Sequence, residues 1–237
     1  MLLASILADA PIRIVHVLLL VAWLGVDVGV FYGSTIIKRA GVLAETRMTL
    51  AKMVLALDLG PRVSLILMIP VGIGLAWASG LGLDELSTGA INALFWGVLL
   101  VAAVWIWALL RDYRLMGSGR QGTRFQVNYK RVDWTLRLAV LLFFLVTGVM
   151  SLVGDGIWEA NHVAWKAVVF VIIIAIGQWI DYSFRDFAPA PRDIVERGET
   201  PARLARLNSA TTAAYPPVLA IYGAVIVMAI LGIARIG

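Results

Sequence analysis

Six long runs of apolar residues alternate with short polar, mostly charged segments along the chain. Each run is long enough to cross a bilayer as a helix, which takes about 20 residues. None shows the alternation of a barrel strand, and lipid offers no hydrogen-bond partner to the backbone. The pattern therefore predicts an all-α polytopic membrane protein, a bundle of six transmembrane helices. We expect the spans at about residues 12–36, 62–80, 91–110, 135–153, 162–180 and 214–234.

Composition supports the same class of protein. Of the 237 residues, 61% are hydrophobic and only 15% are charged, which is too apolar for ordinary packing in water. Because six spans nearly exhaust the chain, we expect a single transmembrane domain, 1–237, whose main partner is the lipid bilayer. The net charge of +5 does not indicate a nucleic-acid partner, because the basic residues lie in loops on one side.

The distribution of lysine and arginine predicts the orientation. The segments joining spans one and two, three and four, and five and six hold 17 of the 20 basic residues. The opposite side carries the following charged residues: Asp84, Glu85, Asp155, Glu159, Arg13, Lys166 and Arg235. The positive-inside rule then places both termini on the outer side. The first apolar run lacks a positive leading segment and a cleavage site, so we expect it to be a span rather than a signal peptide.

Two inner segments have helical patterns of their own. Residues 44–58 predict an amphipathic helix that ends before Gly60 and Pro61, where proline breaks or kinks the chain. Residues 200–213 predict a second interfacial helix, with Thr200 as N-cap and Pro201 as its first residue. The alternative for both segments is a solvated loop.

The chain contains an internal two-helix repeat. Residues 92–113 align without gaps with 161–182, and the matched pairs are Asn92 and Asn161, Trp96 and Trp165, Asp112 and Asp181, and Tyr113 and Tyr182. The preceding spans match through Gly74 and Gly148. Spans two and three therefore look duplicated as spans four and five in the same orientation. His162 and Lys166 replace Ala93 and Gly97 of the first copy, so the second copy holds the candidate chemistry.

A polar stripe follows one face of the first span. His16, Leu20, Trp23 and Asp27 are spaced by four, three and four residues, which puts them on one side of a helix. Since a carboxylate is costly in lipid, this face should point into the bundle.

Asp27 has two interpretations. It relays protons between the two sides, or it forms a structural ion pair with Arg62 or Arg137 of neighbouring spans. Asp58 and Arg62, four residues apart, predict a local ion pair at the inner mouth.

His162 begins span five on the same side as His16. Without cysteine, thiolate sites and covalently attached haem are excluded, but neutral imidazoles from two facing helices can hold haem b iron axially. Arg13 and Lys166 each lie one turn from a histidine and could neutralise the haem propionates, and Trp23 would lie close to the group. Alternatively, the histidines are interfacial and the two cations reach up to lipid headgroups. Four tryptophans predict an outer aromatic belt: Trp77, Trp96, Trp158 and Trp165.

Copper is the competing metal. Met68, Met150 and Met228 are soft ligands in separate spans, but they lack the close spacing of a methionine conduit, so packing explains them better. The sequence shows no phosphate-binding loop, no nucleophile with an adjacent base and no zinc spacing.

The first span resembles that of the CopD-like and HemJ-like superfamily of bacterial integral membrane proteins. The resemblance rests on His16, the run Trp23-Leu24-Gly25, Phe31-Tyr32, and the later Pro61, Pro70 and Gly74, with Trp165-Lys166 similar to the lysine-bearing helix of HemJ-like proteins. It covers roughly the first 110 residues and span five. It implies a helical bundle, with haem b and porphyrinogen oxidation in HemJ-like members or copper uptake in CopD-like members. The six spans differ from the four of HemJ-like proteins.

The leading hypothesis is a haem b-binding membrane protein with His16 and His162 as metal ligands. It would transfer electrons to or from a quinone or a redox protein on the outer side, as an oxidoreductase component in a bacterial inner membrane. The alternatives are a copper or small-solute transporter and a cofactor-free accessory subunit of a larger membrane complex. A homo-oligomer is compatible with each hypothesis.

Overall fold

The computed structural model describes residues 2–39, 41–83, 85–117, 122–184, 187 and 189–234, with side chains between residues 10 and 233. Asp84 and Arg235, which entered the orientation argument, lie outside these residues. The helices are α1 (Leu2–Ile37), α2 (Ala44–Leu57), α3 (Leu59–Ala78), α4 (Thr88–Gly117), α5 (Arg124–Leu152), α6 (Asn161–Ser183), α7 (Pro189–Arg197), α8 (Pro201–Ala213) and α9 (Tyr215–Ala234).

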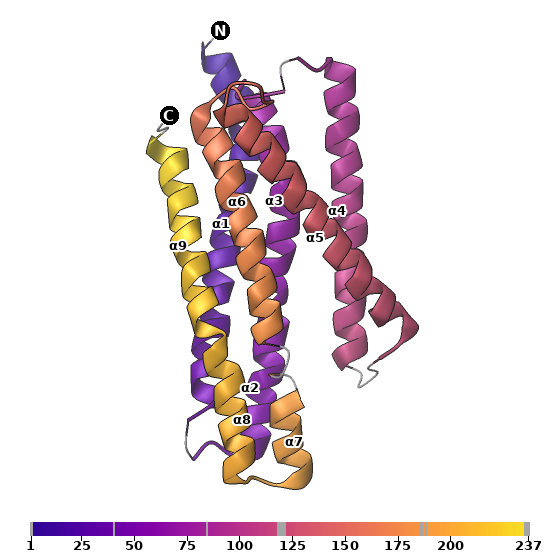
Figure 1. The fold of residues 1–237 in the computed structure, drawn as a ribbon, viewed down its shortest axis with the longest axis vertical. Coiled ribbons are helices and arrows are strands. Elements are labelled where there is room, and N and C mark those ends of the chain that lie inside the picture. The colour runs from indigo at the N-terminus through magenta and orange to yellow at the C-terminus, as the bar shows by residue number, and fades with distance from the viewer. Residues whose placement is uncertain are drawn as a thin grey trace.

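Six helical stretches in the described residues are long and apolar enough to cross a membrane, and they coincide with the six predicted spans. The protein is therefore an all-α, multi-pass membrane protein. The beginning of α1 and the end of α9 lie at one end of the bundle (Figure 1), which we call the terminal end. The opposite end, where α2, α7 and α8 lie, we call the basic end. Because the chain crosses the bundle an even number of times, its two ends lie at the same end of the bundle.

Hydropathy predicts the apolar part of each span better than the ends of its helix. Helix α5 begins at Arg124, well before the predicted residue 135, because its start is fixed by a hydrogen-bonded cap. The Thr123 side chain accepts from the Gln126 backbone, and the Gln126 side chain accepts from the Thr123 backbone. The apolar pattern starts only after this polar first part of the helix.

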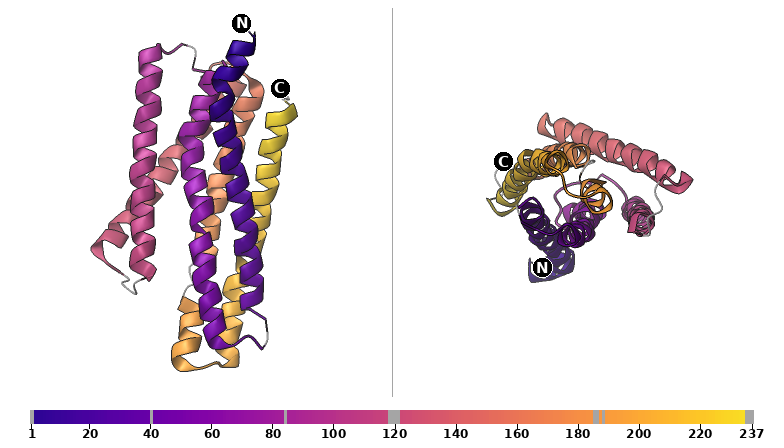
Figure 2. Two further views of the ribbon diagram at one scale, coloured as in Figure 1. Left: turned by 180° about the vertical axis from the view of Figure 1, so that it is seen from behind. Right: turned by 90° about the horizontal axis from the view of Figure 1, so that it is seen from below.

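The helices pack as a bundle with one pair set to the side. Helices α1, α3, α6 and α9 run alongside one another, while α5 crosses obliquely from the top of α6 towards the foot of α4 (Figures 1 and 2). The most extensive contacts join α1 to α3, α5 to α6 and α6 to α9. Helix α4 packs chiefly on α3 and touches α5 much less. The second copy of the repeat, α5 and α6, is therefore packed more tightly than the first, α3 and α4.

The two glycines matched by the repeat both lie where helices approach closely. A Cβ atom on Gly74 would lie 2.8 Å from side-chain atoms of both Ile12 and Phe95. A Cβ atom on Gly148 would lie 3.1 Å from side-chain atoms of Ala167 and Val168. In both copies, the glycine thus lets the first helix approach the second, which agrees with a duplicated pair.

Three short helices cover the basic end. Both predicted interfacial helices form, as α2 and as α8, whose N-cap is Thr200 and whose first residue is Pro201. The break between α2 and α3 falls at Asp58, just before the predicted Gly60 and Pro61. Helix α7 was not predicted; its nine residues have an amphipathic pattern, but the segment is short and has a low mean hydropathy. An apolar cluster holds the three helices to α1: Ile37, Ala51, Val54, Phe187, Ala190, Ile194 and Leu207.

Arg47 of α2 ties this cover to the end of α1. Its side chain is 1% exposed and donates hydrogen bonds to the backbone carbonyls of Ile37, Arg39 and Val42. The last carbonyls of a helix have no partner within the helix, so a buried guanidinium that binds them stabilises the turn after α1.

At the terminal end, the two loops of the repeat pair through one short bridge. The Leu83 amide donates to the Ile157 carbonyl at 2.9 Å, and the Glu159 amide donates to the Leu81 carbonyl at 3.1 Å. Trp158 is consequently 4% exposed and stacks with Phe144, so its assignment to an aromatic belt was wrong. Trp96 and Trp165 are exposed, as the prediction requires.

Candidate functional site

The stripe on α1 faces the interior, as its spacing predicts. Trp23 is 5% exposed, Leu20 packs in the same apolar cluster, and Asp27 lines an internal cavity. His16 is partly buried, and its Nδ1 atom is buried without a hydrogen-bond partner. A buried polar atom without a partner costs about 1–3 kcal/mol, so the ring nitrogen of His16 is available to bind a ligand.

Lys166 of α6 is the charged residue that faces His16. Its ammonium group lies close enough to act electrostatically on the imidazole, and its Nζ atom would be 2.7 Å from a Cβ atom on Gly232 of α9. The nearest atom to a Cβ on Gly72 of α3 is His16 Cε1, at 3.9 Å. We call His16 and Lys166 the histidine site. It is built by α1 and α6 and closed by glycines of α3 and α9.

The remaining predicted haem residues lie nearer the terminal end. His162 is 8% exposed and precedes Lys166 by one helical turn, which is about 6 Å along the axis of α6. Arg13 is exposed, one turn before His16 on α1.

Haem b fits part of this arrangement. His16 fits as an axial ligand because it is interior and has an unsatisfied ring nitrogen, and Lys166 fits as a partner for a propionate. His162 is the candidate for the second ligand because it is buried on the same helix as Lys166, one turn nearer the terminal end. Trp23 lies deeper than His16 by about two turns and packs against α6 and α9.

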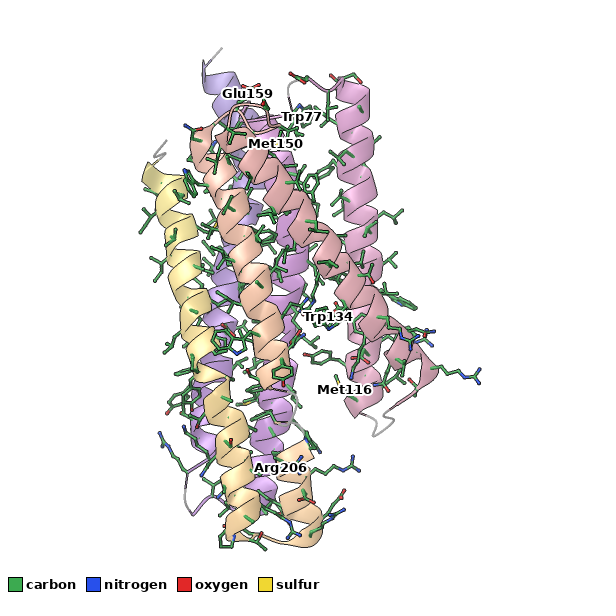
Figure 3. All side chains as sticks on the ribbon, viewed as in Figure 1. Trp77, Met116, Trp134, Met150, Glu159 and Arg206 are labelled. Carbon is green, nitrogen blue, oxygen red and sulfur yellow. The ribbon has the colours of Figure 1, made fainter. Side chains whose placement is uncertain are left out.

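The three methionines do not converge. Met228 packs in the cluster around Trp23, whereas Met150 is 41% exposed and lies near the terminal end (Figure 3). Met68 is partly buried in α3. Within the described part of the chain, no group of three or more His, Asp or Glu side chains is arranged to hold a metal ion. Packing is thus the role that the structure gives to these methionines.

A second polar centre, the charged cavity, lies towards the basic end. All six spans contribute to its lining, and its volume is about 100 Å³. Six ionisable side chains line it: Asp27, Asp58, Arg62, Asp133, Arg137 and Asp181. Trp23, Trp105 and Tyr129 supply aromatic surface.

Five of these ionisable groups form one chain of alternating charge. Arg62 donates to Asp58 at 2.7 Å and to Asp181 at 2.5 Å. Arg137 donates to the other Asp181 oxygen at 2.7 Å and pairs with Asp133 at 2.9 Å. The predicted local pair of Asp58 and Arg62 is confirmed. Asp181 joins the two arginines and so ties α3, α5 and α6 together.

Neutral donors from α4 and α5 complete the two ends of this chain. The Tyr113 hydroxyl donates to Asp58 at 2.7 Å. The Trp105 indole donates to Asp133 at 2.6 Å, and the Tyr129 hydroxyl donates to the same carboxylate at 3.4 Å. The terminal carboxylates are thereby satisfied, as buried charges must be.

Asp27 stands outside this chain of charges. Arg62 and Arg137 both bind other carboxylates, and no ion pair joins Asp27 to a cation among the described residues. Asp27 is close enough to Asp58 for their charges to interact. The Tyr222 hydroxyl of α9 lies beside Asp27, yet it is buried without a hydrogen bond of normal geometry.

Sequence reasoning did not find Asp133 or the bridging role of Asp181, although a signal was present. Each copy of the repeat begins with aspartate four residues before arginine, as Asp58 to Arg62 and as Asp133 to Arg137. Each copy ends in the Asp-Tyr pair already noted. A duplicated ionic motif at the feet of four spans indicates a shared polar centre.

Comparisons of the chain with protein-family models, with curated proteins and with solved structures find no match. The resemblance to CopD-like and HemJ-like proteins therefore stays a prediction. The fold and its polar residues define a multi-pass helical membrane protein with two interior polar centres, one at each half of the bundle.

Proposed function

We propose that this protein binds haem b at the histidine site and takes part in electron transfer with a quinone or a redox protein. The observation that carries the proposal is the His16 ring, whose Nδ1 atom is buried without a partner beside the charge of Lys166. Haem would supply one-electron redox chemistry, while the protein sets its ligands, its charge partners and its access to water.

His16 and His162 would be the axial ligands, and Lys166 and Arg13 would neutralise the propionates. The proposed location is a bacterial inner membrane with both termini outside, which puts the histidine site near the outer surface. The redox partner would then approach from the terminal end of the bundle. Burial supports the two ligands, since His162 is 8% exposed and His16 is partly buried.

Optical and electron paramagnetic resonance spectra of the purified protein, reconstituted with haem b, test this assignment. Two imidazole ligands give a low-spin spectrum, so His162→Ala should convert it to high spin while haem stays bound. His16→Ala should abolish stoichiometric haem binding. Val17→Ala is the matched control, because Val17 neighbours His16 on α1 but its side chain is 50% exposed. Identical spectra and haem content in the wild type and both histidine variants would falsify the assignment.

Transport of a small solute is the second candidate, and the charged cavity favours it. A cavity that all six spans line, mostly apolar but with a few charged groups, is the feature that a carrier needs. Its carboxylates and guanidiniums do not suit copper(I), which prefers thiolate or thioether ligands. Uptake by proteoliposomes that is lost in Asp181→Asn, together with no haem binding by the purified protein, would favour this function over the first.

A further inference from the structure

The charged cavity carries more negative than positive charge. Four aspartates and two arginines line it, so two negative charges are uncompensated at neutral pH if all are ionised. One negative charge is the net charge of the ionic chain of three aspartates and two arginines. Hydrogen bonds from Tyr113, Trp105 and Tyr129 stabilise the aspartates at its two ends. The other negative charge is that of Asp27. Helix α6 also ends at this cavity, and its C-terminal carbonyls add partial negative charge.

Among the residues that the structure describes, no cation forms an ion pair with Asp27. Its side chain shares the cavity with charged groups from three other parts of the bundle: Asp58 and Arg62 at the start of α3, Asp133 and Arg137 of α5, and Asp181 of α6. Tyr222 of α9 interacts with Asp27 but does not line the cavity. Both arginines already bridge two carboxylates each. A lone carboxylate within a membrane span is costly, and binding a cation removes that cost.

The size of the cavity limits the occupant. About 100 Å³ has room for roughly three waters at about 30 Å³ each, whereas an apolar cavity that holds benzene is about 150 Å³. Most of the lining is apolar, but its aspartate and arginine groups can hold water by hydrogen bonds. The volume and the excess negative charge together suit a few waters with a proton or a monatomic cation.

The cavity is placed next to the basic end and closed towards the histidine site. Its lining includes Asp58, Phe184 and Ala214, the residues at which α2, α6 and α8 end. Towards the terminal end, an apolar layer centred on Trp23 packs α1 against α6 and α9. Asp27 and His16 are thus separated along α1 by about 16 Å.

We infer that the charged cavity is a water-filled pocket, reached from the basic end, in which the Asp27 carboxylate takes up a proton from the cavity water. A hydronium ion in the pocket breaks one O–H bond and gives its proton to Asp27, where a new O–H bond forms; a neutral water stays in the pocket and the carboxyl group becomes neutral. The Tyr222 hydroxyl, free of other partners, can then exchange a hydrogen bond with the carboxyl group. This inference does not depend on haem.

Cysteine labelling tests the water in the pocket, because the chain contains no cysteine of its own. Val218 lines the cavity, and its neighbour Leu219 is 58% exposed on the surface of α9. In proteoliposomes, Val218→Cys should react with a charged, membrane-impermeant thiosulfonate at least tenfold faster than Leu219→Cys. Equal rates for the two variants would overturn the water-filled pocket.

Infrared difference spectroscopy tests the proton. A pH step applied to the full-length protein should produce a protonated-carboxyl band that shifts in D₂O and is absent in Asp27→Asn. Asp112→Asn should keep the band, since Asp112 is a buried aspartate of α4 that does not line the cavity. A band that survives in Asp27→Asn, or one that added sodium chloride but not choline chloride abolishes, overturns the assignment. The second result would identify an alkali cation as the occupant.

Discussion

Asp181 holds two guanidiniums at once, so its neutralisation should destabilise the bundle more than any other loss of a single aspartate charge. Asp181→Asn keeps the size of the side chain but removes the charge that faces Arg62 at 2.5 Å and Arg137 at 2.7 Å. The three side chains are 29%, 26% and 12% exposed, respectively, so they are neither fully buried nor free in water.

The magnitude follows from that intermediate burial. Breaking a buried ion pair costs about 3–5 kcal/mol, whereas an exposed pair contributes about 0–1 kcal/mol. Because both arginines keep their second partners, Asp58 and Asp133, the expected loss for Asp181→Asn is about 2–3 kcal/mol. The contacts that weaken join α3, α5 and α6, so unfolding should remain cooperative.

Unfolding in a graded mixture of SDS and mild detergent measures this loss. The repeat provides a matched control in Asp112→Asn, because Asp112 is the counterpart of Asp181 and is 5% exposed, yet its Oδ1 atom has no hydrogen-bond partner. Because Asp112→Asn leaves both bridges of Asp181 to Arg62 and Arg137 intact, we expect it to cost less free energy of unfolding than Asp181→Asn.

A double-mutant cycle keeps the reasoning testable if Asp181→Asn alone is hard to purify. Combining Asp181→Asn with Arg62→Gln should show a coupling of about 1 kcal/mol or more, because the two residues are in direct contact. Equal losses for the two aspartate variants, with additive effects in the cycle, would refute a structural role for the shared carboxylate.

Three further predictions concern packing and helix ends. Arg47→Met should cost about 3 kcal/mol, because it leaves three backbone carbonyls around the end of α1 without their buried donor; chemical denaturation measures the loss. Gly74→Ala should cost about 1–3 kcal/mol through overpacking, whereas Gly25→Ala, with no atom within 4 Å of the new Cβ, should be neutral or slightly stabilising; their melting temperatures in detergent should differ accordingly. Thr123→Ala should cost about 1 kcal/mol by removing the cap of α5, and faster amide exchange in the first turn would report it.

Local patterns were enough to predict much of the fold. The six spans were predictable because lipid forces each apolar run of sufficient length into a helix. The interfacial helix α8 was predictable because Thr200 and Pro201 are local signals for a helix start. Hydropathy failed for the start of α5, where the residues are polar and a cap begins the helix. It also failed for α7, which is amphipathic but only nine residues long.

The candidate site was predictable only in part. The stripe from His16 to Asp27 follows from the geometry of one helix, so its inward face was predictable. The partner of each polar residue was not, because Arg62 meets Asp181 across 119 positions of sequence and Lys166 meets His16 from another helix.

The sequence by itself determined the class of protein, the number of spans and the repeat, since these depend on hydropathy and on residues close together in the chain. Only the tertiary structure decided that Asp181 forms ion pairs with both Arg62 and Arg137, whereas its counterpart Asp112 forms neither. It also decided that Trp158 is buried and that Asp27 pairs with no cation among the described residues. The physical reason is that a charge in a low-dielectric bundle takes whichever opposite charge the helix packing brings within reach, and packing joins residues far apart in sequence.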